Sequence, residues 1–495
     1  MNIRLTQRHK GFILGGAFVI ALCVWLTGLN AVLPMNEDTS LYINMASSLS
    51  QGKGLLITNG VTNKPGNYYP FLYPAMIAPL VNHGAYNFLA LKLVTIFLAI
   101  LFLAAVVYAC RKLYFRQFPL LVAVFICLSS QVALYADTIQ TEIPFTLFSF
   151  CAVWCLEQYG ERKGNFSIFF FLSAFFLFCA MYTRLIGISL LFAVPAWLVL
   201  KKDYRKAGAS LLFFCLLLPW LIQYAVLGSV YVKEFSGSTA TVIELVHRWL
   251  YNLACTIGKE LPDLFFDPRL AGIDPFSKIF FLKLSLGCVL AYLLLKGFIL
   301  KLKKESLAFW DIYVFVYFCF LYLSWTTHGA RYLVPIMVFL AYYLFIGLKS
   351  IIPDDKVFYG AAAVIIALNL QGGTAAALQS RLAPFSASEL SLASAADWIQ
   401  ASTPRESIIM SRKPSWIYLR AGRRGLRFLR YSDPGRQMAE VSRNRVDYIV
   451  IDRNKIFRDD SRDYLLPLVS AYPGNFEKVF DSGGRENTLI YRVKR

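Results

Sequence analysis

The amino-acid sequence predicts a mostly α-helical, polytopic membrane protein with about 11 transmembrane helices and a small C-terminal α/β domain outside the membrane. The 495-residue chain is 57% hydrophobic and 16% charged, whereas a soluble globular domain is about half apolar and about a quarter charged. Runs of about 20 apolar residues recur up to residue 373. The composition then becomes polar, which predicts a transmembrane domain over residues 1–373 and an extramembrane domain over residues 374–495.

The apolar runs define the expected spans, which are residues 11–34, 88–109, 118–135, 143–157, 166–182, 185–200, 209–227, 279–300, 309–327, 331–348 and 357–373. Basic residues gather at alternate ends of these runs, as the positive-inside rule requires. The basic clusters are Arg4–Lys10, Arg111–Arg116, Arg162–Lys163, Lys201–Lys206 and Lys301–Lys304. We therefore expect the clusters in the cytoplasm, and the loops 35–87 and 228–278 and the C-terminal domain on the extracytoplasmic side. The first run lacks a cleavage site, so we expect it to remain as a span.

The net charge of +20 follows this topology, so it indicates contact with the bilayer and no nucleic acid. The ten cysteines show no CxxC spacing and no disulfide framework, and the four histidines show no metal-ligand spacing. The chain also has no Walker motif, GxGxxG, nucleophile elbow or HExxH, which argues against a soluble nucleotide donor.

Two regions outside the spans carry secondary-structure patterns. Residues 243–257 have helical apolar spacing, which predicts an interfacial helix. In the C-terminal domain we expect a linker, a helix, two strands and a hairpin. The expected linker is 384–394, the helix 393–400, the strands 407–410 and 446–452, and the hairpin joins 476–480 to 488–493 around Gly483-Gly484.

The adjacent carboxylates Glu37 and Asp38 follow the first span, and three interpretations fit them. They could be solvated at the end of the span, with Asp38 as the N-cap of a helix over 39–49. They could bind a divalent cation, Mg²⁺ or Mn²⁺, through oxygen ligands, although no motif requires a metal. One of them could act as a general base toward an acceptor hydroxyl.

Further charges on the same face favour the third interpretation. The turn 135–142 brings Asp137 and Glu142 to the extracytoplasmic side, where they are otherwise ordinary wet loop residues. Arg184 and Arg331 interrupt apolar sequence at that side, where topology disfavours positive charge and where snorkelling is the alternative. Guanidinium groups suit phosphate oxygens, so together these residues predict a site for a phosphate-bearing ligand at membrane level. Lys64 adds a cation, and His328 lies near Arg331, although an ordinary interfacial histidine is the favoured interpretation there.

Several segments, in chain order, resemble one known family. They are Glu37-Asp38 with Tyr42, Gly52-Lys-Gly54, Tyr69–Pro74, Thr141–Phe145, Thr183–Gly187, Pro219-Trp220 and Arg331–Pro335, followed by the α/β tail. This order resembles the GT-C type integral-membrane glycosyltransferases, in particular the aminoarabinose-transferase and protein-mannosyltransferase-like group (glycosyltransferase family 39-like). The resemblance implies a GT-C fold in a bacterial inner membrane. It also implies that a sugar moves from a polyprenyl-phosphate donor, such as undecaprenyl phosphate, to a lipid, glycan or protein acceptor of the cell envelope, with inversion.

By the same resemblance, Asp38 looks like the catalytic base, Glu37 its neighbour and Glu142 a second acidic residue of the site. The residues expected to bind substrate are Tyr42, Lys64, Tyr69, Asp137, Arg184, His328, Arg331 and Tyr332. The chain departs from the family in two places: the order Glu-Asp replaces Asp-Glu, and the segment at Lys64 lacks the Lys-Pro-Pro of the aminoarabinose transferases. The base therefore stays open between Glu37 and Asp38.

Two other functions are compatible with a multi-span membrane protein that has an external domain. A transporter or flippase of a lipid-linked glycan would show repeats and polar residues at mid-membrane. The chain has no repeat, and its candidate charges lie near the ends of spans. A non-catalytic scaffold with an external sensing domain would not need acidic residues on two separate turns.

Overall fold

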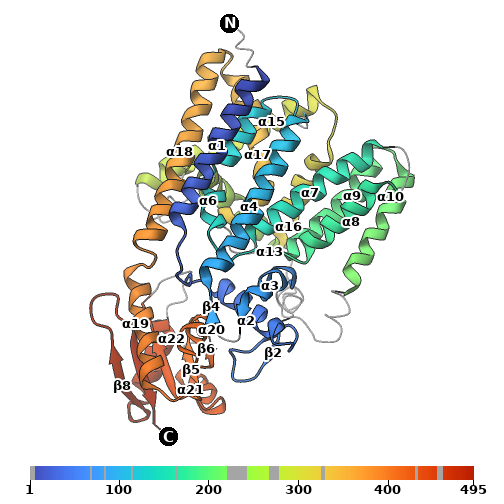
Figure 1. Ribbon diagram of the computed structural model, residues 1–495. Helices are drawn as coiled ribbons and strands as arrows, with labels where there is room; N and C mark the ends of the chain where they lie inside the picture. Colours follow the sequence, from blue (N-terminus) through green and yellow to red (C-terminus); the bar gives the residue numbers. More distant parts are fainter. Residues whose placement is uncertain are drawn as a thin grey trace. The chain divides into compact units, whose positions relative to one another are not determined.

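The computed structural model describes residues 6–66, 70–82, 85–112, 115–162, 166–219, 242–266, 278–324, 329–429, 433–453 and 461–494. The chain forms two compact units (Figure 1). The first, which we call the helical unit, contains Met1–Asn30, Asn67–Tyr73 and Leu89–Arg381. The second, the α/β unit, contains Ala31–Gly66, Pro74–Phe88 and Leu382–Arg495.

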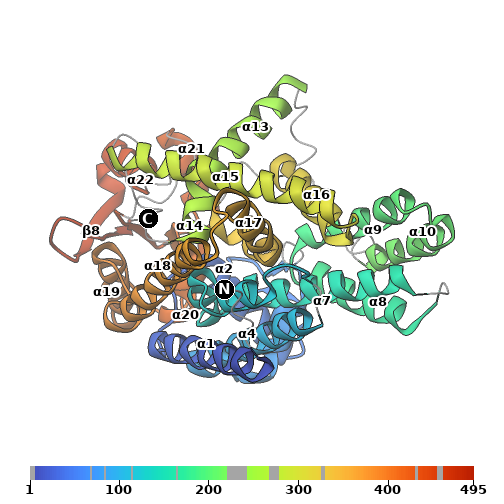
Figure 2. The same ribbon diagram turned by 90° about the horizontal axis from the view of Figure 1, so that it is seen from above.

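The helical unit is built from long apolar helices joined by short connections. Its main helices are α1 (Gln7–Gly28), α4 (Phe88–Arg111), α5 (Pro119–Cys127), α6 (Ser130–Ala136), α7 (Glu142–Glu161), α8 (Ile168–Met181), α9 (Ile188–Leu200), α10 (Tyr204–Ser210), α13 (Val242–Cys255), α14 (Leu261–Phe265), α15 (Lys278–Lys304), α16 (Phe309–Ser324), α17 (Met337–Ile351) and α18 (Asp355–Leu382). In both views α8, α9 and α10 lie at the side of this unit remote from α18 (Figure 2).

Each expected span contains a helix, with part of 209–227 outside the described residues. Within the described part of the chain, five helices are long and apolar enough to cross a membrane, and the bent pair α5–α6 makes a sixth. Three more apolar helices, Ile168–Met181, Leu185–Leu200 and Phe309–Leu323, are shorter. The chain is therefore a multi-pass membrane protein, and the number of about 11 spans stays a prediction. The helix expected over 243–257 is confirmed as α13 and the π-helix Thr256–Glu260, although the flanks of loop 228–278 lie outside the described residues.

In this unit an asparagine stabilises a bend between two helices, and a glycine permits a close contact between two others. The α5–α6 pair bends by 41°, and the freed amide of Ser130 donates to Oδ1 of Asn369 on α18 at 2.5 Å. Such a partner is required where water cannot reach the backbone. Helices α15 and α17 approach so closely that a Cβ on Gly297 would lie 1.8 Å from the carbonyl oxygen of Tyr343. Small residues permit this contact between apolar helices.

The α/β unit contains a five-stranded mixed sheet in the order β6-β5-β7-β9-β8. The strands are β5 (Ile409–Ser411), β6 (Gly425–Arg427), β7 (Tyr448–Ile451), β8 (Phe476–Asp481) and β9 (Leu489–Val493). Strands β6, β5 and β7 are parallel, and β7, β9 and β8 are antiparallel. The predicted buried strand is confirmed as β7, and the predicted hairpin as β8–β9, whose turn holds Gly483 and Gly484 at φ of 74° and 77°.

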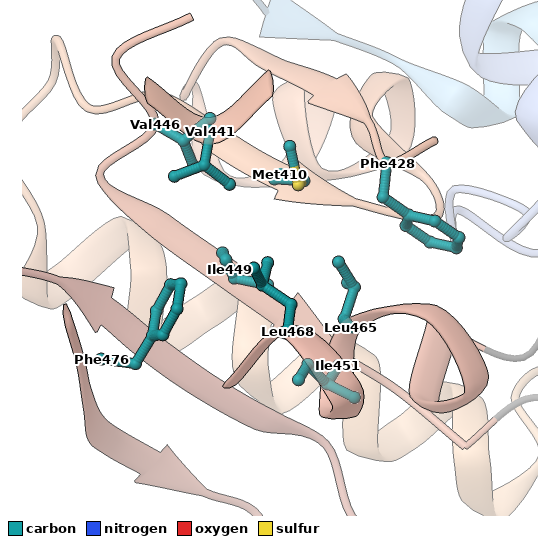
Figure 3. Close-up of a cluster of buried hydrophobic side chains, with 9 residues drawn as sticks. All are labelled: Met410, Phe428, Val441, Val446, Ile449, Ile451, Leu465, Leu468 and Phe476. Atoms are coloured by element: carbon teal, nitrogen blue, oxygen red, sulfur yellow. The ribbon is translucent and has the colours of Figure 1, made fainter. Parts of the chain in front are cut away.

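Nine buried side chains form the core of this unit (Figure 3). Seven come from β5, β7, β8, α21 (Pro434–Arg443) and α22 (Ser461–Ala471), and the other two, Phe428 and Val446, lie just outside β6 and β7. Met410 comes from β5, and Ile449 and Ile451 come from β7, the middle strand of the sheet. Parallel strands buried on both faces read as continuous apolar runs, which is why VDYIVID could be recognised in the sequence.

The expected linker over 384–394 is wrong. α19 (Ala387–Ser402) begins there with a capping box, in which the Ser386 hydroxyl accepts from the amide of Glu389 and the Glu389 carboxylate accepts from the amide of Ser386. The small polar residues that suggested a linker are those that favour a helix start. The predicted domain boundary at 373/374 lies inside α18, and the contacts place the boundary at Arg381/Leu382.

The first loop also has a defined partner within the α/β unit. Its helix α2 (Glu37–Ser50) packs against α20 (Pro414–Ala421) of the C-terminal segment. A further contact joins the backbone of Asn59 to that of Gly425, whose amide donates to the Asn59 carbonyl at 2.8 Å. The loop and the C-terminal segment therefore fold together.

Candidate functional site

Four residues predicted from the sequence meet in the helical unit, and we call them the acid–arginine cluster: Glu142, Arg184, Arg331 and Tyr332. Glu142 is the first residue of α7 and is 2% exposed. Arg184 follows the end of α8 and precedes a short 3-10 helix, Leu185–Gly187. Arg331 and Tyr332 belong to another 3-10 helix, Ala330–Tyr332. Breaks at the ends of apolar helices thus bring the charged side chains together.

The cluster is held by short polar contacts. Arg184 donates from Nη1 to Oε1 of Glu142 at 2.6 Å, and Nη1 of Arg331 lies 3.9 Å from the same oxygen. Both guanidinium groups lie over the Tyr332 ring, at 5.1 Å for Arg184 and 4.9 Å for Arg331. Nη2 of Arg331 also donates to the Tyr332 hydroxyl at 3.0 Å. Tyr317 anchors the turn, because its hydroxyl donates to the Tyr332 carbonyl at 2.7 Å.

The cluster carries a net positive charge, and its two arginines differ in exposure. Two guanidinium groups face one carboxylate, so the cluster has a formal charge of +1. The Arg184 side chain is 14% exposed, whereas that of Arg331 is 32% exposed. Arg184 therefore neutralises the buried Glu142, and Arg331 is the more exposed of the two arginines, a residue type whose guanidinium suits an oxyanion such as phosphate.

Asp137, predicted for the same site, contacts a different set of residues. It follows α6 and accepts at Oδ2 from the Ser380 hydroxyl of α18 at 3.3 Å. A Cβ on Gly28 would lie 2.8 Å from that oxygen, so α1 passes close to it. The buried Lys92 of α4, whose charge acts on Asp137, donates to Oδ1 of Asn30 at 2.8 Å. Lys92 was not among the residues predicted for the site, although a lysine inside an apolar span is a recognisable signal.

The two carboxylates of α2 have different surroundings within the α/β unit. The proposal that Asp38 caps this helix is wrong, because Asn36 is the N-cap and its Oδ1 accepts from the amide of Asp38 at 2.9 Å. Glu37 accepts at Oε1 from the Ser415 hydroxyl at 2.5 Å and from the Ser415 amide at 3.4 Å. Its Oε2 is buried and has no hydrogen-bond partner among the described residues.

The surroundings of Glu37 also set its titration. Burial raises the pKa of Glu37, while the hydrogen bonds from Ser415 and the charges of Arg427 and Lys413 act in the opposite direction. Burial, with help from the charge of Arg412, lowers the pKa of Lys413 to about 8. Lys413 donates from Nζ to the carbonyl oxygen of Met35 at 2.5 Å, so it braces the chain just before α2.

Asp38 is half-buried and lies one position further along the helix. Successive residues of an α-helix differ by about 100° around its axis, so Asp38 presents its carboxylate to a different direction from Glu37. Tyr42, one turn further, is 6% exposed. The structure thus gives Glu37 a partner in the C-terminal segment, in Ser415, which no local signal in the sequence revealed.

The remaining predicted residues are only partly described. The backbone of Lys64 pairs with that of Ile57 in a two-stranded ladder, β1 (Leu56–Ile57) with β2 (Lys64–Pro65). Tyr69 and His328 lie outside the described residues. In the described part of the chain, no group of three or more His, Cys, Asp or Glu residues is arranged to hold a metal ion.

Comparison with known proteins gives matches at the level of structure. No family model and no curated protein sequence matches the chain. The structure of ArnT from Cupriavidus metallidurans bound to undecaprenyl phosphate aligns over 97% of this chain and 98% of that chain, with 12% identity and a TM-score of 0.60. The oligosaccharyltransferase AglB from Archaeoglobus fulgidus, in complex with an inhibitory peptide and a dolichol-phosphate, aligns over 98% and 74%, with 10% identity and a TM-score of 0.60.

The chain has the GT-C fold. A second structure of the Archaeoglobus fulgidus oligosaccharyltransferase, tethered to an acceptor peptide, aligns with 12% identity over 99% of this chain and 74% of that chain, at a TM-score of 0.57. The predicted resemblance is therefore confirmed for the fold. At these identities the likeness concerns the GT-C fold alone.

Proposed function

We propose that this protein is an inverting glycosyltransferase of the bacterial inner membrane that uses a polyprenyl-phosphate sugar as donor. The transfer takes place on the extracytoplasmic face, where the α/β unit lies, and the acceptor is a hydroxyl-bearing lipid, glycan or protein of the envelope. The observation that carries this proposal is the GT-C fold over nearly the whole chain, shared with an ArnT structure that holds undecaprenyl phosphate and an AglB structure that holds dolichol-phosphate.

The acid–arginine cluster provides the electrostatics for the leaving group. As the bond between the anomeric carbon and the phosphate oxygen breaks, that oxygen gains negative charge. Arg331, the more exposed of the two arginines, stabilises this charge, and Arg184 holds Glu142 so that the carboxylate does not compete for Arg331. Removing one such donor commonly lowers turnover by about 10²–10³.

We assign the base to Asp38 and a positioning role to Glu37. Asp38 accepts the proton of the acceptor hydroxyl as the oxygen attacks the anomeric carbon from the face opposite the phosphate, which inverts the configuration. Glu37 is occupied by Ser415, so it fixes the first turn of α2 and hence the direction of the Asp38 carboxylate. The products are the glycosylated acceptor and polyprenyl phosphate.

Isosteric variants test this assignment. Asp38→Asn should abolish transfer of a radiolabelled sugar from polyprenyl phosphate in proteoliposomes, while donor binding persists. Glu37→Gln keeps an acceptor for the Ser415 hydroxyl, so it should retain part of the activity. Full activity in Asp38→Asn with loss in Glu37→Gln or Glu142→Gln would move the base to the corresponding residue.

The alternative from a different class is a flippase of a lipid-linked glycan. The buried Lys92 and Asp137 of the helical unit are the observation that favours it, because ionisable groups inside a bundle are typical of transport pathways. Movement of labelled donor lipid across the bilayer without any sugar transfer would establish that function instead.

A further inference from the structure

A polar cavity of about 460 Å³ lies at the end of α7 that is remote from Glu142. Its charged lining comes from the ends of α7 and α15 and from the residues that follow α4, α7 and α15: Lys112, Arg116, Glu157, Glu161, Arg162, Lys301 and Glu305. Helix α7 has 20 residues, so at 1.5 Å per residue its two ends are about 30 Å apart, the thickness of a bilayer's hydrocarbon core. The cavity is therefore separate from the acid–arginine cluster and lies at the other membrane surface.

The deepest charges of this cavity already have partners. Lys301 is 1% exposed and pairs with the buried carboxylate of Asp311. Glu157 accepts at Oε1 from the amide of Phe309, the first residue of α16, at 3.4 Å. Lys301 and Glu157 thus form the floor of the cavity.

The charges around the rim are not paired with one another. In the described part of the chain no ion pair within 4.0 Å involves Lys112, Arg116 or Arg162, or the carboxylates Glu161 and Glu305. Glu305 accepts at Oε1 from the Tyr342 hydroxyl at 2.8 Å, which fixes its side chain at the rim. Lys206 donates from Nζ to the carbonyl oxygens of Gly160 and Arg162 at the end of α7. These carbonyl groups therefore already have a cationic partner other than the cations of the rim. Lys112 Nζ lies 5.8 Å from the centroid of the Tyr108 ring, and Glu305 also accepts from Nε2 of Gln117 at 3.4 Å. Three cations and two carboxylates thus line the cavity without an ion-pair partner among the described residues.

The wall beside the rim has the character of a membrane interface. Tyr108 and Trp154 pack edge to face with ring centroids 5.7 Å apart, and the Arg162 guanidinium lies 4.4 Å above the Phe169 ring. Tyrosine and tryptophan favour the level of the lipid head groups. Next to them, Ile168 and Phe171 of α8 are 63% and 57% exposed, which gives an apolar surface for acyl chains.

We infer that this cavity binds the head group of a membrane phospholipid that carries both a phosphate and a primary ammonium group. The guanidinium groups of Arg116 and Arg162 and the Lys112 ammonium bind the phosphate oxygens, and the carboxylates of Glu161 and Glu305 accept hydrogen bonds from the ammonium. An anionic head group without an amine would leave both carboxylates facing its phosphate, which disfavours it. The acyl chains lie along the exposed face of α8.

Native mass spectrometry of the full chain, with lipids of identical acyl chains, tests the inference. We expect phosphatidylethanolamine to be retained at least roughly tenfold more strongly than phosphatidylglycerol, and also more strongly than phosphatidylcholine, whose quaternary ammonium has no N–H to donate. Retention of all three lipids to the same extent would overturn the inference. Displacement of the lipid by free phosphoethanolamine at the same concentration would contradict the membrane as the source of the ligand.

Two double variants separate the two halves of the site. Glu161→Gln/Glu305→Gln should abolish the preference for phosphatidylethanolamine over phosphatidylglycerol, and Gln keeps an acceptor for Tyr342. Arg116→Gln/Arg162→Gln should weaken the retention of both lipids. The control is Lys303→Gln/Lys304→Gln, which removes two exposed cations at the same end of α15 that do not line the cavity. An unchanged preference in the carboxylate variant, or an equal loss in the control, would contradict the inference.

Discussion

Glu142 depends on its two guanidinium partners to different degrees, because Arg184 lies at 2.6 Å and Arg331 at 3.9 Å. Arg184→Gln leaves a buried carboxylate without its close partner, which should lower the free energy of unfolding by about 3 kcal/mol. Arg331→Gln removes a partly exposed and more distant charge, so we expect about 1 kcal/mol or less. Thermal unfolding in detergent measures both.

The double variant Glu142→Gln/Arg184→Gln is the control for this prediction. It removes the buried charge together with its partner, so it should recover much of the stability lost in Arg184→Gln. If Arg331→Gln were as destabilising as Arg184→Gln, Arg184 would not be the main partner of Glu142.

The pH dependence of transfer should report the environment of Glu37. Burial raises its pKa, and the Ser415 hydroxyl acts against this rise by donating to the ionised carboxylate. In our proposal the ionised Glu37 accepts the Ser415 hydrogen bond and fixes the first turn of α2, so part of the activity should be lost as the pH drops through that raised pKa. Ser415→Ala removes the hydrogen bond, raises the pKa of Glu37 further and should move the acid limb of the pH–kcat profile to higher pH.

Ser415→Thr keeps the hydroxyl, so the acid limb of its pH–kcat profile should lie at the same pH as in the wild type. In the Glu37→Gln background the acid limb should no longer move when Ser415→Ala is added, because the carboxyl on which this hydroxyl acts is gone. An unchanged acid limb in both Ser415→Ala and Glu37→Gln would remove Glu37 from the titration of the site.

At the scale of elements, the close contact between α15 and α17 makes Gly297 a sensitive position. An added Cβ would lie 1.8 Å from the Tyr343 carbonyl oxygen, so the two helices must separate in Gly297→Ala. We expect a loss of about 3 kcal/mol or more in stability, measured by thermal unfolding in detergent. Gly360→Ala on α18 is the matched control, since nothing lies within 4 Å of its Cβ position. Equal melting temperatures for the two variants would contradict the contact.

The bend between α5 and α6 gives a second test. Asn369 accepts from the Ser130 amide at 2.5 Å and donates to the Leu264 carbonyl at 3.2 Å. Asn369→Leu leaves both backbone groups buried without this partner, which should cost about 2 kcal/mol. Gln371→Leu, two residues further on the exposed face of the same helix, should cost far less. A similar loss of stability in both variants would show that the hydrogen bonds of the Asn369 side chain do not support the bend.

The elements that could be predicted are those whose signal is local. The hairpin β8–β9 was indicated by Gly483-Gly484, and β7 by its uninterrupted apolar run. The linker prediction failed because the capping pair Ser386 and Glu389 was not recognised. The acid–arginine cluster was predicted from charges that interrupt apolar sequence, which membranes make expensive.

At the scale of the whole molecule, the missing information concerned long-range contacts. Ser415 and Glu37 are 378 positions apart, and nothing around either residue indicates the other. The packing of the first loop with the C-terminal segment has a functional consequence in our account. Changes in the C-terminal segment should alter catalysis through α2, without touching substrate.

In our proposal this GT-C chain transfers sugar from a polyprenyl phosphate. The most direct measurement uses proteoliposomes with a panel of doubly labelled polyprenyl-phosphate sugars, and it follows the sugar and the lipid separately, with Asp38→Asn as the control. We predict that, for one donor, the sugar label leaves the lipid in the wild type and stays on it in Asp38→Asn. Movement of both labels together across the bilayer, with no release of sugar from any donor, would contradict it.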